Sequence, residues 1–148
     1  MKKFNFRLQV VLDIKEKLLE EKLLELAKIQ RSLQDAIHKQ KELEQYQLEI
    51  NNALVNVFQS GNDLDLMEVQ RYKDFINKLI VDISNQKVVI QNVNRVLDIK
   101  RKEVNEIIKE KKVLEKLKEN QQKKYYQEME VYDRKELDDI SSRRYRTA

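Results

Sequence analysis

The only histidine of the chain, His38, lies between two carboxylates, and this group comes nearest to metal-binding chemistry. Asp35 stands three residues before it and Glu42 four residues after it, so a helix would place all three side chains on one face. Such a ligand set could hold a metal only weakly. Ordinary polar pairing on the exposed side of a helix explains the same spacing, and we therefore expect no metal site here.

Other catalytic chemistry has equally little support. The chain has no cysteine, which excludes a thiol nucleophile, a disulfide and a cysteine-based zinc site. A single glycine is too few for a phosphate-binding loop or a dinucleotide-binding fingerprint. We therefore expect a protein that is not an enzyme and that has no cofactor and no small-molecule substrate. Any nucleotide chemistry would belong to a partner.

The composition is typical of long helices or coiled coils. The 148 residues include 38% charged residues and only 7% aromatic residues, with no proline. High charge also favours disorder, but the net charge is only +4 and 41% of the residues are hydrophobic, so disorder is the weaker interpretation. No apolar run approaches the roughly 20 residues of a membrane span, and no signal peptide is apparent. We expect a cytoplasmic protein.

Apolar residues recur with a heptad period in the first part of the chain. Ten of the fourteen positions in two heptad rows are apolar, so these rows predict one buried seam along a helix. The first row consists of Leu12, Leu19, Leu26, Leu33, Gln40, Gln47 and Leu54. The second row consists of Lys15, Lys22, Ile29, Ala36, Leu43, Ile50 and Val57.

A cleaner seam follows the glycine. Its two rows are Val69, Ile76, Ile83, Ile90, Leu97 and Val104, and Tyr72, Leu79, Gln86, Val93, Lys100 and Ile107. Lysines then take the next places of the first row, at Lys111 and Lys118, while Leu114 and Leu117 continue the apolar stripe. This change predicts a shift of register near residue 110.

One break between two seams predicts an all-α fold in which two long helices form an antiparallel coiled-coil hairpin with a C-terminal helical overhang. We expect a single domain with a helix over about 5–58, a turn over about 59–65, a helix over about 66–141 and a short tail over 142–148. Ser60, Gly61 and Asn62 suit the turn, and Asp65 with Glu68 suits a helix N-cap with a reciprocal carboxylate. Paired residue numbers should sum to about 124, on the geometry of such a turn.

Two alternatives remain open, one for how the helices pair and one for what the chain binds. A parallel dimer would bury the same seams in another chain. Residues 100–124 contain ten Lys or Arg against five Glu, and such a basic stretch could meet nucleic acid. Glutamates interleave with these cations at helical spacing, so a solvated helix face is the commoner explanation of the basic stretch. As a binding partner for this stretch, nucleic acid is a weaker prediction than an acidic protein surface.

The last part of the chain holds an excess of aromatic residues on the expected overhang. Tyrosines and arginines are the types enriched in binding hot spots, and "SSRRYRTA" ends the chain with three arginines. Equally, the rings could cap the open end of the hairpin, against Phe4 and Phe6. The aromatic residues of this part are Tyr125, Tyr126, Tyr132 and Tyr145.

Three segments of the chain resemble the FliJ family of bacterial flagellar export proteins. The opening "FNFRLQVVLDIKEKLLEEK" is similar to the family's start, and "KEVNEIIKEKKVLEKLKENQQKKYYQE" is similar to its basic stretch. The segment "DRKELDDISSRRYR" resembles the acidic and arginine-containing end. Residues 40–99 carry little of the family signature, so a stalk protein of a related virulence-type secretion system and a purely structural coiled coil remain alternatives.

The resemblance implies a function that composition does not. Proteins of this family are helical hairpins similar to the stalk of rotary ATPases, and they associate with the hexameric export ATPase and with the export gate protein FlhA. It therefore implies a non-enzymatic stalk that couples these two partners, with export chaperones as a further partner, at the cytoplasmic face of the inner membrane.

The resemblance also suggests which residues make these contacts. A gate contact would lie nearer the turn, where the exposed or half-exposed candidates are Tyr46, Tyr72 and Phe75. Candidates for contact with acidic and apolar surfaces of the ATPase are Phe4, Phe6, Arg7, Lys15, Arg134, Arg143, Arg144 and Tyr145.

Overall fold

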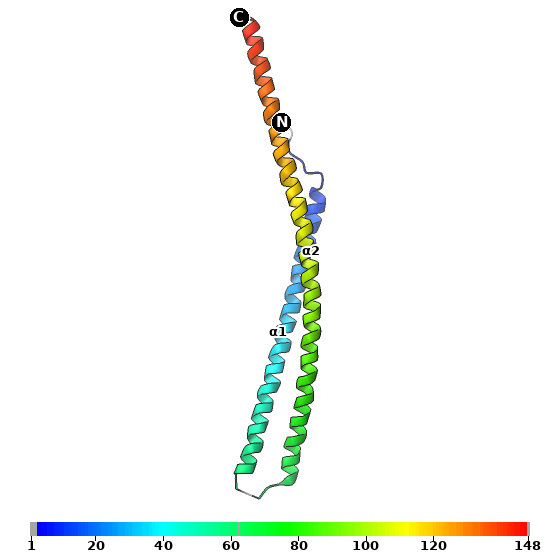
Figure 1. Cartoon of the computed structure of the whole chain (residues 1–148), viewed down its shortest axis with the longest axis vertical. Helices are drawn as coiled ribbons and strands as arrows, with labels where there is room; N and C mark the ends of the chain where they lie inside the picture. Colours follow the sequence, from blue (N-terminus) through cyan, green and yellow to red (C-terminus); the bar gives the residue numbers. More distant parts are fainter. Residues whose placement is uncertain (1–2, 62, 148) are drawn as a thin grey trace. The chain divides into compact units, whose positions relative to one another are not determined.

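Two long α-helices make up nearly all of the computed structural model, which describes residues 3–61 and 63–147. Helix α1 spans Gln9–Gln59 and helix α2 spans Leu66–Thr147, and the described residues contain no strand (Figure 1). The prediction of an all-α hairpin is confirmed. Contacts divide the chain into two compact units: unit 1 comprises residues 1–22 and 103–148, and unit 2 comprises residues 23–102.

In unit 2 the two helices pack antiparallel, as the order of their paired residues shows. The side chain of Lys100 lies 2.6 Å from Glu25, and Gln86 Nε2 donates a hydrogen bond of 2.9 Å to the Ala36 carbonyl. A residue later in α1 therefore pairs with a residue earlier in α2. These pairs sum to 125 and 122, close to the expected value. In Figure 1 these are the cyan part of α1 and the green part of α2.

Unit 1 has the same antiparallel pairing. Lys15 forms an ion pair with Glu110, and Lys22 forms one with Glu103 at 3.5 Å. A step of seven residues forward along α1 is thus matched by a step of seven back along α2. This is the repeat of a heptad seam, so the ion pairs follow the coiled-coil register.

The predicted seam is the core of both units. Every position in the heptad rows up to residue 107 is buried or partly buried, including the polar ones. Because a heptad repeat keeps one face of each helix turned to its partner, the order of residues alone was enough to locate this core. The fully buried members are Leu12, Ala36, Val69, Leu79, Ile83, Gln86, Leu97, Val104 and Ile107.

The predicted shift of register near residue 110 is wrong. Lys111, Leu114 and Lys118 are partly buried, whereas Leu117 is 37% exposed. The first heptad row therefore continues as far as Tyr125, which is also partly buried, and the second row continues to Leu114, since Gln121 is exposed. Lysine can occupy such a place because its methylene stem packs against apolar neighbours while its ammonium group reaches water.

Both outer ends of the helices differ from the expected boundaries. Helix α1 begins at Gln9 rather than near residue 5, because the chain turns before it: the Gln9 amide donates to the Phe6 carbonyl at 3.0 Å, and the Phe6 side chain is buried. Helix α2 continues to Thr147, so the described part of the expected tail is helical, and Ala148 lies outside the described residues. Arg144 and Arg146 in the last turn favour this extension because they complement the helix dipole.

The connection between the helices contains the glycine turn and the aspartate N-cap that the sequence predicted. After α1 ends, Ser60 Oγ donates to the Val57 carbonyl at 3.0 Å and Gly61 adopts a φ of 69°. Asp65 caps α2, since its Oδ1 accepts the Met67 amide at 3.0 Å. The reciprocal hydrogen bond from Glu68 is not formed within residues 63–147, and Asn62 lies outside the described residues.

Candidate functional site

The residues that came nearest to metal-binding chemistry form an ordinary surface pair. His38 Nε2 lies 2.8 Å from Glu42 on the exposed side of α1. Among the described residues no three potential ligands come together as a metal site would require. Over the same residues, neither helix has a stretch long and apolar enough to cross a membrane.

In unit 2, three aromatic residues from the two helices form one cluster. Tyr46 on α1 and Phe75 on α2 meet edge to face, with ring centroids 5.4 Å apart. Together with Tyr72 they line a groove of about 370 Å³. We call Tyr46, Tyr72 and Phe75 the unit 2 aromatic cluster. The structure thus brings together all three residues that were expected to contact an export gate, and Glu68 and Arg71 add charges at the rim.

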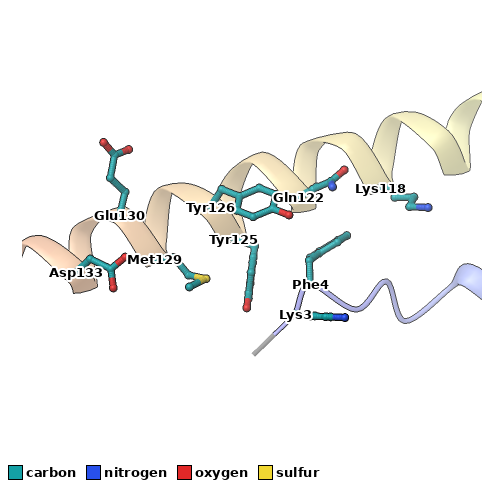
Figure 2. A pocket seen from close by; sticks show the side chains of 9 residues that line it. All are labelled: Lys3, Phe4, Lys118, Gln122, Tyr125, Tyr126, Met129, Glu130 and Asp133. Carbon is teal, nitrogen blue, oxygen red and sulfur yellow. The ribbon is translucent and has the colours of Figure 1, made fainter. Parts of the chain in front are cut away.

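In unit 1, a second aromatic cluster joins the N-terminal segment to α2. The Phe4 ring lies 5.6 Å from the Tyr125 ring, and Tyr125 lies 5.6 Å from Tyr126. With Met129 they line an open groove of about 830 Å³. Figure 2 shows Tyr125 and Met129 pointing toward the N-terminal segment. We call Phe4, Tyr125, Tyr126 and Met129 the unit 1 aromatic cluster.

One of the two interpretations of these aromatic residues, that they cap the open end of the hairpin, is correct for Phe4 but not for Phe6. Tyrosines were expected to cap the hairpin end against Phe4 and Phe6, and Tyr125 does contact Phe4. Phe6 is instead only 4% exposed, so its ring belongs to the core and is not available on the surface. Lys15 is engaged in its interhelical ion pair with Glu110. Phe6 is therefore part of the core of unit 1, and Lys15 already has a partner on the other helix.

Beyond the unit 1 aromatic cluster, α2 carries an exposed C-terminal segment, residues 134–146. Every side chain in it is exposed, and Tyr145 reaches 89% exposure. Arg134 forms an ion pair of 3.0 Å with Glu130, one turn before it on the same helix. Arg143 and Arg144 also lie in this segment, and Arg7 is exposed near the start of α1. The ATPase candidates thus divide into buried Phe6, paired Lys15, partly buried Phe4 and a group of exposed residues.

The basic stretch of α2 is largely compensated by glutamates on the same helix. Glu119 accepts a hydrogen bond from Lys123 and lies near Lys116, and these contacts hold the pKa of its carboxyl below the ordinary value. Lys111 pairs with Glu115 at 3.7 Å. Farther along, a hydrogen bond to Glu136 raises the pKa of Tyr132. Local pairing of this kind is typical of a solvated helix face and does not favour nucleic acid.

The antiparallel seam and the two surface clusters define the chain as a coiled-coil hairpin protein. Residues 4–148 match the family model described as flagellar FliJ protein. The chain belongs to the FliJ family, whose members are components of the flagellar protein export apparatus. Comparisons with curated proteins and with solved structures found no match. The family match covers residues 40–99 as well, where the sequence had carried little recognisable signature.

Proposed function

We propose that this chain is a non-enzymatic stalk of the flagellar export apparatus that binds the hexameric export ATPase and the export gate protein FlhA and couples the two. Membership in the FliJ family supports a role in flagellar export. The observation that carries the finer proposal is the exposed C-terminal segment, because it offers arginines and a tyrosine on helical turns that have no covering helix. The proposal includes export chaperones as a further partner and places the chain at the cytoplasmic face of the inner membrane.

The ATPase contact is assigned to the C-terminal segment together with partly buried Phe4 and exposed Arg7 of unit 1. Arginine and tyrosine combine charge with a large contact area, which suits an interface with acidic and apolar parts. Arg134 can exchange its exposed partner Glu130 for a partner on another protein, since exposed pairs of this kind contribute little to stability. The proposed contact residues are Phe4, Arg7, Arg134, Arg143, Arg144 and Tyr145.

Charge reversal tests this contact. Arg143→Glu with Arg144→Glu should weaken binding to the purified export ATPase about tenfold, because two attractive charges become repulsive. The matched control is Arg31→Glu with Lys39→Glu, two exposed residues of α1 in unit 2, which changes the net charge equally. Binding is measured by biolayer interferometry at low salt. Equal loss in both double variants, or no loss in the first, contradicts the assignment.

The gate contact is assigned to the unit 2 aromatic cluster. Tyr46 and Phe75 form an edge-to-face pair beside a groove, and such rings contribute most of the binding energy in many interfaces. Their side chains come from both helices, so the cluster exists only when the hairpin is formed. A partner that inserts an apolar side chain between Tyr46 and Arg71 would cover it.

Removal of one ring tests the gate contact. Tyr46→Ala should weaken binding to the soluble part of the export gate by about tenfold or more, the range of an interface hot spot. Tyr132→Ala is the control, since this tyrosine is exposed on α2 of unit 1. Isothermal titration calorimetry measures both, with circular dichroism to verify helicity. If the two variants bind equally well, the unit 2 aromatic cluster does not contact the gate.

A further inference from the structure

The C-terminal part of α2 carries a heptad row of its own, on the orange and red turns in Figure 1. Its steps of four and three residues return to one side of a helix. Three members have large side chains that reach solvent, since Tyr126, Leu137 and Ile140 are 56%, 64% and 49% exposed. We call this row the C-terminal row. Its members are Tyr126, Glu130, Asp133, Leu137, Ile140 and Arg144.

The C-terminal row is separate from the seam of the hairpin. It begins one residue after Tyr125, the last partly buried member of the hairpin's first row. Every described side chain from residue 134 to 146 is exposed, so α1 does not cover the row. Leu137 and Ile140 are thus an apolar pair that the described residues leave uncovered. The hairpin's own rows would continue on another side of the helix with exposed and mostly polar residues, namely Tyr132, Lys135, Asp139 and Ser142.

The charges of the C-terminal row change sign along it. Glu130 and Asp133 precede the apolar pair, and Arg144 follows it. The positions that flank one side of the row have the same order, with Glu136 first and Arg143 last. The other charged residues between 130 and 144 are Arg134, which flanks the opposite side and pairs with Glu130 of its own helix, and Lys135, Asp138 and Asp139, which face away from the row.

We propose that this face pairs with the same face of a second copy of the chain, in antiparallel orientation. The two-fold axis passes between residues 138 and 139, so opposed residue numbers sum to about 277. Leu137 then packs on Ile140 of the second copy, and Asp133 meets Arg144 of the second copy. Because the axis relates the two copies, each contact occurs twice. We call this surface the C-terminal pairing face. It is defined by Glu130, Asp133, Glu136, Leu137, Ile140, Arg143 and Arg144.

Charge complementarity selects both the second copy and its direction. In the antiparallel pair, Glu136 lies beside Arg143 of the second copy, just as Asp133 lies beside Arg144. Flanking ion pairs of this kind set the partner and the orientation of coiled coils. A parallel pair would instead oppose Asp133 with Asp133 and Arg144 with Arg144, and like charges disfavour it. A lipid surface needs a broad apolar stripe, which a row that ends in charges at both sides does not offer.

The pairing should be weak, and it has one consequence for the proposed function. Two apolar layers are few, so the interface lies at the small end of the range and self-association should appear at roughly 100 µM. Arg143 and Arg144 also belong to the proposed ATPase contact, so the dimer would cover part of that contact. The export ATPase would then compete with self-association. This consequence rests on the proposed function, whereas the pairing itself does not.

Sedimentation of the full chain alone tests the pairing. Analytical ultracentrifugation up to about 500 µM, well above the concentration expected for a small interface, should show a monomer–dimer equilibrium. Leu137→Ser with Ile140→Ser should abolish the dimer, because both apolar layers are lost. The matched control is Val131→Ser with Tyr132→Ser, which removes two exposed side chains of α2 outside the C-terminal row and should leave the dimer unchanged. Circular dichroism verifies that each variant keeps its helicity.

Charge exchange and crosslinking test the orientation. Asp133→Arg alone and Arg144→Asp alone should each weaken self-association by at least about tenfold, since each opposes like charges in the antiparallel pair. The two changes combined should restore it, because unlike charges face each other again. Arg134→Cys mixed with Ser141→Cys should form a disulfide between the two variants, and neither variant alone should do so. These positions lie side by side only in the antiparallel pair.

Several outcomes would overturn the pairing. A chain that stays monomeric over the whole concentration range does so, as does a dimer that persists in Leu137→Ser with Ile140→Ser or that the control also abolishes. Charge reversals without effect, or disulfides that join equal positions, indicate a parallel pair or another face and contradict the proposal equally. If the chain is monomeric while Leu137→Ser with Ile140→Ser weakens binding to the export ATPase, the face belongs to the ATPase contact. This inference then fails and the proposed function does not.

Discussion

At the scale of single residues, Gly61 is the position where the backbone itself requires a particular residue type. Its φ of 69° lies in the left-handed region, two residues after α1 ends at Gln59. A glycine here is the common end of an α-helix because it has no Cβ to clash with the preceding carbonyl. The single glycine of the chain thus marks the reversal between the two helices.

Replacement of Gly61 should therefore destabilise the hairpin through the backbone alone. Gly61→Ala is expected to lower the free energy of unfolding by about 1–2 kcal/mol, the cost of holding a Cβ in the left-handed region. No heavy atom lies within 4 Å of an added Cβ, so steric contact adds nothing. Urea unfolding measures the change. Gly61→Asn should cost less because asparagine tolerates this conformation, and equal stability of all three proteins would contradict the explanation.

Gln86 is the one fully buried polar side chain of the seam, and its hydrogen bond to the Ala36 carbonyl joins the two helices. A polar residue at such a place commonly specifies register and oligomeric state at some cost in stability. Gln86→Leu should raise the free energy of unfolding by about 1 kcal/mol through apolar burial. It should also allow larger oligomers, which analytical ultracentrifugation would detect. A less stable protein that stays in the wild-type oligomeric state would mean that the hydrogen bond matters more for stability than for specificity.

At the scale of the helices, the sequence predicted the buried seam, because the seam follows a heptad period. It did not predict the features that depend on contacts between segments far apart in the chain. The heptad rows identified the seam correctly up to residue 107, and paired residue numbers sum to a nearly constant value, as expected, in Lys100 with Glu25 and Gln86 with Ala36. They gave the wrong register beyond residue 110, because leucine was assumed to enter the seam in preference to lysine. The segment before Gln9 follows no heptad, so the burial of Phe6 could not be predicted from the pattern, and the contact of Phe4 with Tyr125 was only one of two open interpretations.

The lysines in the seam of unit 1 should make it less stable than apolar residues would, because a charged side chain at a heptad position buries less apolar surface. Lys15 occupies a heptad position with its side chain 29% exposed, while its partner Glu110 is 51% exposed. Because so exposed an ion pair contributes little, Lys15→Leu should raise the free energy of unfolding by roughly 1 kcal/mol through added apolar burial. Lys17→Leu, on the exposed side of α1, is the control and should change little. Chemical denaturation compares them, and a loss of stability in Lys15→Leu would show that the ion pair outweighs the packing.

At the scale of the whole molecule, stability and the proposed ATPase contact belong to different parts of the chain. The hairpin core lies in the heptad rows, which end at Tyr125, whereas all described side chains from 134 to 146 are exposed. Helical turns without a covering partner contribute little to a cooperative transition, because most helical stability in proteins comes from packing of an apolar face. The same turns carry Arg134, Arg143, Arg144 and Tyr145. The side chains of residues 134–146 are therefore available for contact with a partner, and they contribute little to the stability of the fold.

Removal of residues 134–148 should separate the two properties. The thermal midpoint of the truncated protein should stay within about 2 °C of that of the full chain, since the deleted turns bury little. Binding to the export ATPase should fall by at least about tenfold, as expected when interface arginines and a tyrosine are lost, whereas binding to the export gate should not change, because Tyr46, Tyr72 and Phe75 are untouched. Calorimetry and biolayer interferometry give the three values. A large drop in the thermal midpoint would mean that the C-terminal segment belongs to the folded core, and retained ATPase binding would move that contact to Phe4, Arg7 or another surface of unit 1.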